Sequence, residues 1–88
     1  MGERLRALRK SHNLTQEQLA EEIYITTKVY TTAKSISDYE NDKVLPNPRT
    51  LQAIADYFHV TVDYLLKGNQ ESDDTEQTNQ ANYPYLAL

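Results

Sequence analysis

Few side chains in this sequence could take part in covalent catalysis or metal binding. The two histidines, His12 and His59, have no cluster of carboxylate or thiol ligands around them, and there is no cysteine. A metal site is therefore not expected. Ser11 precedes His12, but neighbouring residues on a helix point in different directions and do not form a nucleophile with its base. Because a glycine-rich phosphate loop is also missing, we predict that the chain is not an enzyme and uses no cofactor.

Charged side chains divide the chain into two parts. Residues 69–88 contain four of the 13 acidic residues and no lysine or arginine, so the first 68 residues carry nine acidic and nine basic side chains. The net charge of −4 belongs to the C-terminal part. A neutral N-terminal part does not indicate nucleic-acid binding by its composition, so any such function depends on where its basic residues lie.

Length and composition predict one small cytoplasmic domain followed by a tail. A chain of 88 residues can bury a modest core, and the lack of cysteine, signal peptide or long apolar run is typical of a cytosolic protein without a membrane segment. We expect residues 1–68 to fold and the acidic residues 69–88 to form a disordered tail. The tail ends in the apolar letters YPYLAL, which are either a frayed end, a docking segment for a protein partner, or the start of a second domain.

Hydrophobic spacing and capping residues predict helices in residues 1–68. A first helix from Glu3 to Lys10 has Leu5 and Leu8 on one face, and the chain should turn near Asn13. The second helix should start at Gln16, because the preceding LTQEQ contains a capping box of threonine and glutamine.

Three further helices follow from similar signals. Thr32 can cap a third helix, Asn47 a fourth with Pro48 in its first turn, and Thr61 a fifth that ends at Gly68. The apolar residues that recur on one face of each predicted helix are expected to form the core. They include Leu19, Ala20, Ile36, Tyr39, Leu51 and Ile54.

The segments LRALRKSHNLTQEQLA and YENDKVLPNPRTLQAIADYFHVTVDYLL, in this order, closely resemble the Cro/cI-type (XRE) helix-turn-helix family of phage repressors. The resemblance covers about residues 2–68. It implies an all-α, five-helix, lambda-repressor-like domain whose third helix binds double-stranded operator DNA. Physical reasoning agrees, since a short helix that begins with small and polar residues fits the roughly 12 Å major groove.

The resemblance places four residues of the third helix against base edges, namely Thr32, Ala33, Lys34 and Asp38. An ammonium at Lys34 can serve guanine O6 and N7, and Ala33 can contact a thymine methyl. Asp38 can accept a hydrogen bond from cytosine N4, or it can be an ordinary solvated charge that phosphates repel.

Five polar or basic side chains are expected to contact DNA phosphates: Gln16, Lys28, Asn41, Lys43 and Arg49. All but Lys28 match family positions. Gln16 opens the second helix, where the positive end of the helix dipole favours phosphate. The resemblance also pairs Arg9 with Glu40 to join the first helix to the end of the third, and we assign that pair to structure.

One stretch departs from the family pattern. The letters YITTKVYTTAKS nearly repeat themselves, and about six residues, Tyr24 to Val29, exceed what the family needs between its second and third helices. Because threonine, valine and tyrosine have poor helix propensity, we expect a bulged loop, with the third helix starting at Ala33. The alternative is a third helix extended back to Thr27. In the loop, Lys28 would lie near the DNA backbone.

The expected function is therefore sequence-specific repression of transcription by a regulator of phage or mobile-element type, acting as a homodimer on two half-sites. The alternative is a protein-interaction module of the same fold, such as an antitoxin or antirepressor-binding adaptor, whose tail grips another protein.

Overall fold

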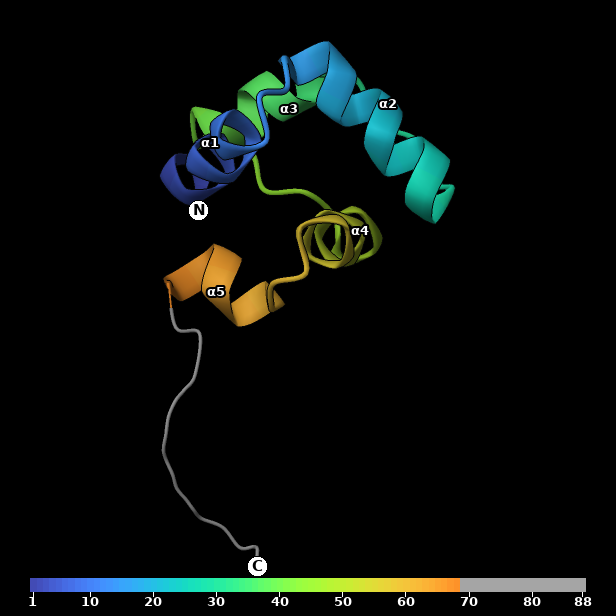
Figure 1. Ribbon diagram of the computed structural model, residues 1–88. Helices are drawn as coiled ribbons and strands as arrows, with labels where there is room; N and C mark the ends of the chain where they lie inside the picture. The colour runs from blue at the N-terminus through green and yellow to red at the C-terminus, as the bar shows by residue number, and fades with distance from the viewer. Residues whose placement is uncertain (69–88) are drawn as a thin grey trace, which may run out of the picture.

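A computed structural model describes residues 1–68, and five helices make up most of this part of the chain (Figure 1). The helices are α1 (Gly2–Ser11), α2 (Gln16–Thr27), α3 (Ala33–Glu40), α4 (Pro48–Phe58) and α5 (Val62–Lys67). The predicted all-α, five-helix fold is thus confirmed. No helix of this part is long and apolar enough to cross a membrane. The predicted acidic tail and its apolar end lie outside the described residues.

Four helices begin at the side-chain caps that the sequence predicted. At the start of α2, Thr15 Oγ1 accepts from the Gln18 backbone N–H at 3.0 Å, and the Thr15 N–H donates to Gln18 Oε1 at 2.9 Å. This reciprocal pair is the expected capping box. The other three caps accept from the backbone in the same way: Thr32, Asn47 and Thr61.

The first helix is capped from another part of the chain. It begins at Gly2, one residue earlier than predicted, and no side chain near its start in sequence caps it. Instead the Gly2 N–H donates to Asp42 Oδ1 in the loop after α3, at 2.9 Å. A Cβ at Gly2 would lie 2.2 Å from the Glu40 carbonyl oxygen, so only glycine allows this close approach. The start of α1 therefore packs directly against the end of α3 and is hydrogen-bonded to the loop that follows it.

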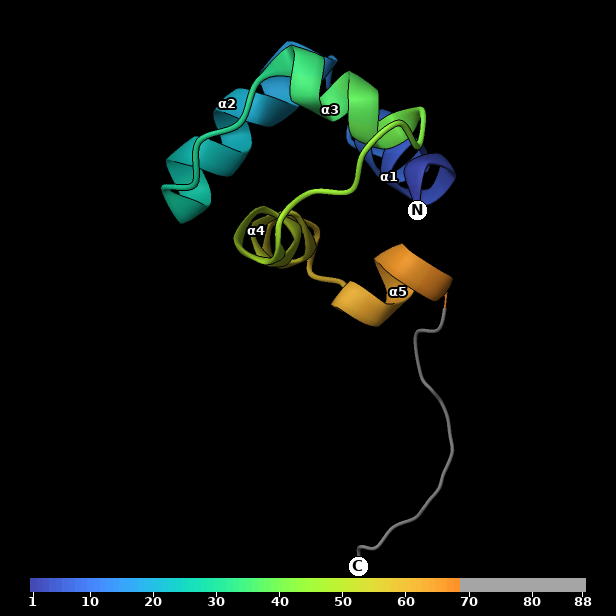
Figure 2. The same cartoon turned by 180° about the vertical axis from the view of Figure 1, so that it is seen from behind.

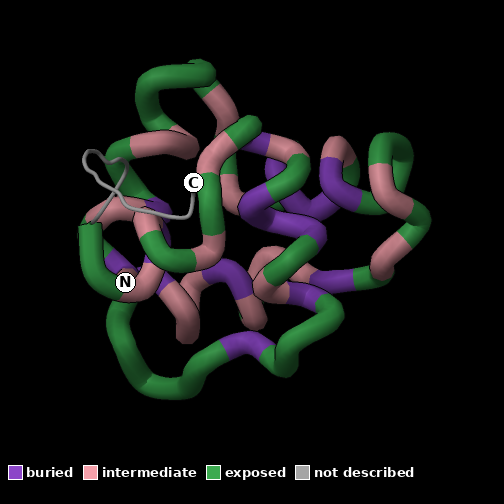
Figure 3. The backbone as a smooth tube through the Cα atoms, turned by 90° about the horizontal axis from the view of Figure 1, so that it is seen from below, coloured by how far each residue is buried: buried purple, intermediate pink, exposed green. Residues whose placement is uncertain are grey.

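The core lies between the two groups of helices seen in Figure 1, with α1 to α3 above and α4 and α5 below. The tube in Figure 3 shows its buried positions along the backbone. Most of the predicted core residues are buried, while Tyr39 and Leu51 are half-buried and pack against the core. The largest fully buried side chains come from all helices: Leu5, Leu19, Ile23, Ile36, Ile54 and Leu65.

The inserted stretch adopts neither structure that was predicted for it. Tyr24 to Thr27 form the last turn of α2, and only residues 28–32 are irregular before α3 begins. The predicted start of α3 at Ala33 is confirmed, but the bulged loop from Tyr24 is wrong, as is an α3 extended back to Thr27.

Tertiary packing explains why α2 continues through residues of poor helix propensity. Ile23 is fully buried, which fixes the final turns of the helix against the core. Thr27 Oγ1 donates to the Ile23 carbonyl at 2.7 Å, and the Lys28 N–H donates to the Tyr24 carbonyl at 2.8 Å. The helix then stops at Lys28, which takes a left-handed conformation with φ of 64°.

Candidate nucleic-acid interface

The third helix presents one apolar face to the core and one polar face to solvent. Ile36 is fully buried and Tyr39 packs against the core, whereas 85% of the Lys34 side chain is exposed. The buried face packs against both α1 and α2, and Figure 2 shows α3 lying across them from behind. Since two helices hold its inner face, α3 can offer its outer face to a ligand without unfolding.

The two charged residues of this outer face form a pair. Lys34 Nζ donates to Asp38 Oδ2 at 3.0 Å, one helical turn away. This pair was not predicted from the sequence, although the i, i+4 spacing of the two residues was a sufficient signal for it. An ammonium has three donors, so Lys34 can make two further hydrogen bonds while it donates to Asp38.

The hydroxyl of Thr32, a residue predicted to contact bases, forms its hydrogen bonds within the protein. The Thr32 hydroxyl accepts from the Ser35 N–H at 3.0 Å and donates to Ser35 Oγ at 3.1 Å. Its role in the structure is to cap the helix. Ala33 follows as the first helical residue and is half-buried. Of the four predicted base-contact residues, Thr32 thus precedes α3, Ala33 and Lys34 lie in its first turn, and Asp38 lies one turn after Lys34.

A buried carboxylate joins the three helices behind this surface. The Glu40 side chain is fully buried and accepts from Arg9 Nε at 2.5 Å and Arg9 Nη2 at 3.0 Å. This is the pair that the family resemblance implied. Gln16 Nε2 also donates to Glu40 Oε1, at 3.2 Å, a contact that the sequence did not predict because it joins distant segments. Gln16 therefore starts α2 with its amide directed toward α3.

The Glu40 carboxylate is held in its charged form. Burial alone would raise the pKa of Glu40, but hydrogen bonds from Arg9 and Gln16, with the charges of Arg9 and Arg6, more than compensate. The pKa of Glu40 is therefore lowered from its ordinary value, while the bond to Glu40 raises the pKa of Arg9. The Arg9 and Glu40 side chains therefore both stay charged at neutral pH.

The other predicted phosphate contacts are exposed but lie in different places. Asn41 and Lys43 belong to the loop after α3, and Asn41 Nδ2 donates to Ser37 Oγ at 3.4 Å. Arg49 lies in the first turn of α4. In Figure 2 this loop leaves the end of α3 and leads to the start of α4.

Lys28 is separated from the start of α3. It ends α2, and in Figure 2 residues 28–32 run back from there to α3. The neighbours of Lys28 in sequence, Thr27 and Val29, line a small depression together with Arg49. The Lys28 ammonium itself lies over the Tyr24 ring, with Nζ 5.7 Å from the ring centroid.

His12 packs against an aromatic ring, and His59 ends α4 in a left-handed conformation. The His12 ring meets the Phe58 ring edge to face, with 5.0 Å between centroids. Within residues 1–68 there is no group of three or more His, Cys, Asp or Glu side chains that could hold a metal ion.

This arrangement of helices has counterparts among known proteins. A family model described as a helix-turn-helix domain matches residues 2–71, which is most of the chain. The chain belongs to this helix-turn-helix family. The XRE-type resemblance seen in the sequence is confirmed, and within the helix-turn-helix motif α2 is the first helix and α3 the second.

Curated relatives of this helix-turn-helix chain are transcriptional regulators. It is 40% identical over 81 residues to the HTH-type transcriptional activator BcrR of Enterococcus faecalis, covering 92% of this chain and 37% of that protein. It is 35% identical over 81 residues to repressor protein C2 of Salmonella phage P22, covering 92% of this chain and 32% of that repressor. The chain thus spans about a third of the length of each of these relatives.

A solved structure matches the helix-turn-helix fold directly. The P22 c2 repressor in complex with a synthetic operator has a TM-score of 0.67 and 32% sequence identity to this chain. The match covers 77% of this chain and 94% of the repressor chain. The lambda-repressor-like fold class inferred from the sequence is therefore confirmed.

Proposed function

We propose that residues 1–68 bind operator DNA in a sequence-specific manner, with α3 in the major groove, and that the protein represses transcription in the cytoplasm. The observation that carries this proposal is the structural match to a repressor bound to its operator, at 32% identity over 77% of the chain. The exposed Lys34 and its half-buried partner Asp38 on α3 supply the donors and acceptors that base edges require.

Each proposed contact has a separate physical task. Lys34, Ala33 and Asp38 read base edges, and Thr32 positions the helix by capping it. Positive and amide side chains outside α3 hold the phosphate backbone without reading sequence. The proposed backbone contacts are Gln16, Lys28, Asn41, Lys43 and Arg49.

We further propose that the protein binds as a homodimer on two half-sites about one helical turn apart. A single domain of this size buries too little DNA surface for tight binding, and two-fold symmetric operators suit helix-turn-helix dimers. Repression then follows from steric blocking of a promoter. Neither catalysis nor a cofactor is required for this function.

Selection of duplexes from a random-sequence pool tests the proposal. The full 88-residue chain should enrich a palindrome whose half-site centres lie about 34–36 Å apart. Footprinting of the winning duplex should then protect both half-sites together. A matched Lys67→Ala variant, altered on the exposed end of α5, should select the same site. Enrichment of no common sequence would refute sequence-specific binding, and a single unpaired half-site would refute the dimer.

A further inference from the structure

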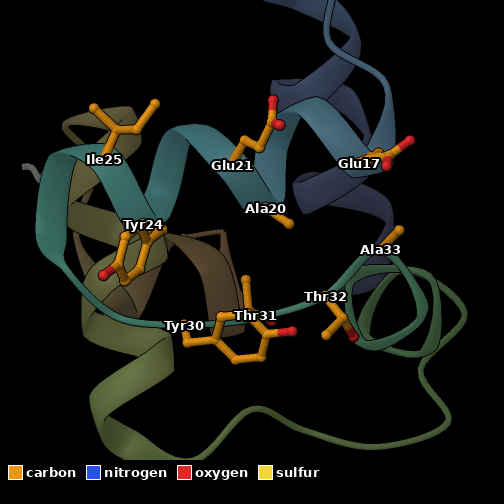
Figure 4. Close-up of a pocket in the computed structure, with 9 residues that line it drawn as sticks. All are labelled: Glu17, Ala20, Glu21, Tyr24, Ile25, Tyr30, Thr31, Thr32 and Ala33. Atoms are coloured by element: carbon orange, nitrogen blue, oxygen red, sulfur yellow. The ribbon is translucent and has the colours of Figure 1, made fainter.

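The segment between α2 and α3 carries an exposed aromatic side chain, that of Tyr30. Tyr30 is 76% exposed, although it lies only two residues before Thr32, the residue that caps α3. Figure 4 shows it on the segment that leads into α3, opposite α2. A side chain this exposed leaves its hydroxyl to solvent, whereas the Tyr57 hydroxyl donates to Glu22 Oε1 at 3.4 Å. The core therefore gains little from the ring of Tyr30, and its hydroxyl is free to meet a ligand.

The residues on both sides of Tyr30 hold its backbone in place. Thr31 is only 8% exposed, and Val29 packs against the core. The Val29 N–H also donates to Thr27 Oγ1 at 3.2 Å, which ties the segment to the end of α2. Because inward-facing residues flank it, Tyr30 is directed outward from an ordered backbone. A ligand that binds Tyr30 therefore loses little affinity to ordering of the chain.

Tyr30 faces the same side of the molecule as the start of α3. Tyr30, Thr32 and Ala33 line one open hollow, whose other wall is α2. Since Ala33 is proposed to contact a base edge, DNA that is seated on α3 comes within reach of Tyr30. Lys34 follows Tyr30 by four residues, which span at most about 14 Å when extended. At about 3.4 Å per base pair, this length corresponds to about four base-pair steps of the duplex.

The charge and chemistry of the hollow decide which part of DNA can meet Tyr30. Glu17 and Glu21 on the α2 wall are exposed carboxylates, so they repel phosphates from that wall. Tyr30 belongs to the opposite wall, and its hydroxyl is a neutral donor. Phosphate oxygens are acceptors, and tyrosine is one of the side chains that donate to them in protein–DNA complexes. A phosphate can therefore lie at the outer edge of the hollow, beside Tyr30.

We propose that Tyr30 is a further DNA contact. Its hydroxyl donates a hydrogen bond to one phosphate of the half-site, and its ring packs against the adjoining deoxyribose. This inference rests on the proposed binding of α3 in the major groove. The contact raises affinity but carries no sequence information, because every base pair presents the same phosphate. Since the phenol is neutral, the contact also leaves the salt dependence of binding unchanged.

Removal of the hydroxyl alone tests the contact. Tyr30→Phe should weaken binding of the full chain to the selected duplex about tenfold. The loss should be the same on duplexes altered at single base pairs, and the slope of log K against log salt should not change. Unaltered affinity would overturn the proposal. A loss confined to one base position would overturn it as well, because that result would show contact with a base edge.

A second exposed tyrosine provides the matched control. Tyr24 lies on the α2 wall of the same hollow and is 49% exposed, with Lys28 over its ring. Tyr24→Phe should bind DNA like wild type. Both variants keep the ring, so their melting temperatures should stay close to that of wild type. An equal loss of affinity in the two variants would show that the effect is not specific to Tyr30 and would refute the contact.

Uncharged phosphates locate the contact. Each phosphate of the selected duplex is replaced in turn by a methylphosphonate, and its affinity for wild type and for Tyr30→Phe is measured. At one position the replacement should weaken wild type several-fold more than Tyr30→Phe. That position should lie within about four base-pair steps of the base pair whose preference depends on Lys34. Equal losses for both proteins at every phosphate would refute the hydrogen bond.

Failure of this inference can be distinguished from failure of the proposed function. If selection enriches a common site but Tyr30→Phe binds it like wild type, only the Tyr30 contact is refuted. If selection enriches no common site, recognition by α3 fails and the Tyr30 contact fails with it.

Discussion

The contact between Lys34 and Asp38 changes the base preference that is expected of α3. Each residue alone offers a different base preference, since an ammonium suits guanine and a carboxylate suits cytosine N4–H. In the structure they are one pair, 3.0 Å apart, with Lys34 largely exposed and Asp38 mostly covered. Asp38 therefore orients Lys34 and lowers the cost of ordering its long side chain against DNA.

Replacing Lys34 should reduce specificity more than stability. Lys34→Ala should cost about 1–3 kcal/mol of binding free energy on the best duplex and relax the preference at one base position. Its side chain is 85% exposed, so the melting temperature should hardly change. Fluorescence anisotropy with duplexes altered one base pair at a time measures this, with Lys67→Ala as the control. An equal loss on every duplex would show that Lys34 contacts phosphate.

Replacing Glu40 should have the opposite effect, on folding. Glu40→Gln leaves the Arg9 guanidinium with a weaker acceptor in a buried place and should lower the free energy of unfolding by at least about 2 kcal/mol. Urea unfolding at pH 7 measures the change. Glu3→Gln on the exposed face of α1 is the control and should stay within about 0.5 kcal/mol of wild type.

The lowered pKa of Glu40 also predicts a pH dependence. A carboxylate with a folded-state pKa below its unfolded value stabilises the fold above the unfolded pKa and loses that contribution as the pH falls through the folded one. Wild type should therefore lose stability below about pH 4.5, the ordinary glutamate pKa, more steeply than Glu40→Gln. Parallel curves for the two proteins would contradict the assignment.

At the scale of elements, the length of α2 is the main feature that distinguishes this chain from the expected family pattern. The extra turn at Tyr24 to Thr27 is stabilised by the burial of Ile23 and ends in a left-handed residue that is not glycine. Lysine in this conformation is strained by contact of its Cβ with the backbone, and glycine is not.

A glycine at the end of α2 should therefore stabilise the protein. Lys28→Gly should raise the free energy of unfolding by about 0.5–1 kcal/mol, because φ at this position is 64°. The matched variant Thr26→Gly, inside the same last turn, should instead lower it by about 0.5–1 kcal/mol. Thermal unfolding followed by circular dichroism distinguishes the two. Destabilisation by both glycines to the same extent would show that α2 does not end at Lys28.

Local signals explain why most element boundaries could be predicted from the sequence. Thr15, Thr32, Asn47 and Thr61 cap helices through bonds that span three residues, so their spacing alone was informative. The end of α2 was predicted wrongly because propensity ignores the buried Ile23. Propensity is a weak guide where tertiary packing opposes it.

Long-range bonds in the candidate site could not be predicted from residue spacing. The bond from Gly2 to Asp42 spans 40 residues, and the bond from Gln16 to Glu40 spans 24. The Arg9 and Glu40 pair was expected only through resemblance to a family. The pairing of Lys34 with Asp38 is local and could have been predicted.

At the scale of the whole molecule, acidic and basic side chains are balanced in number. Residues 1–68 have equal numbers of the two, and two of the exposed acids, Glu17 and Glu21, lie on α2. The exposed Lys34, Lys43 and Arg49 belong to α3, the loop after it and the start of α4. Asp38 and the exposed Asp42 lie on the same segments, so basic and acidic side chains alternate there.

Each basic side chain that contacts a phosphate should contribute separately to the salt dependence of DNA binding. Arg49→Ala should weaken binding to specific and random duplexes alike and reduce the slope of log K against log salt by about one. Lys67→Ala, on the last turn of α5, should leave the slope unchanged. Titrations at four salt concentrations are sufficient, and an unchanged slope for Arg49→Ala would remove it from the DNA surface.

The most direct single measurement is the ratio of affinities of the full chain for the selected duplex and for a scrambled duplex of the same composition, at physiological salt. If α3 reads base edges, the selected duplex should bind about 10³-fold more tightly or better, and Lys34→Ala should reduce that ratio. A ratio near one, with affinity that disappears as salt is raised, would contradict sequence-specific DNA recognition by this chain.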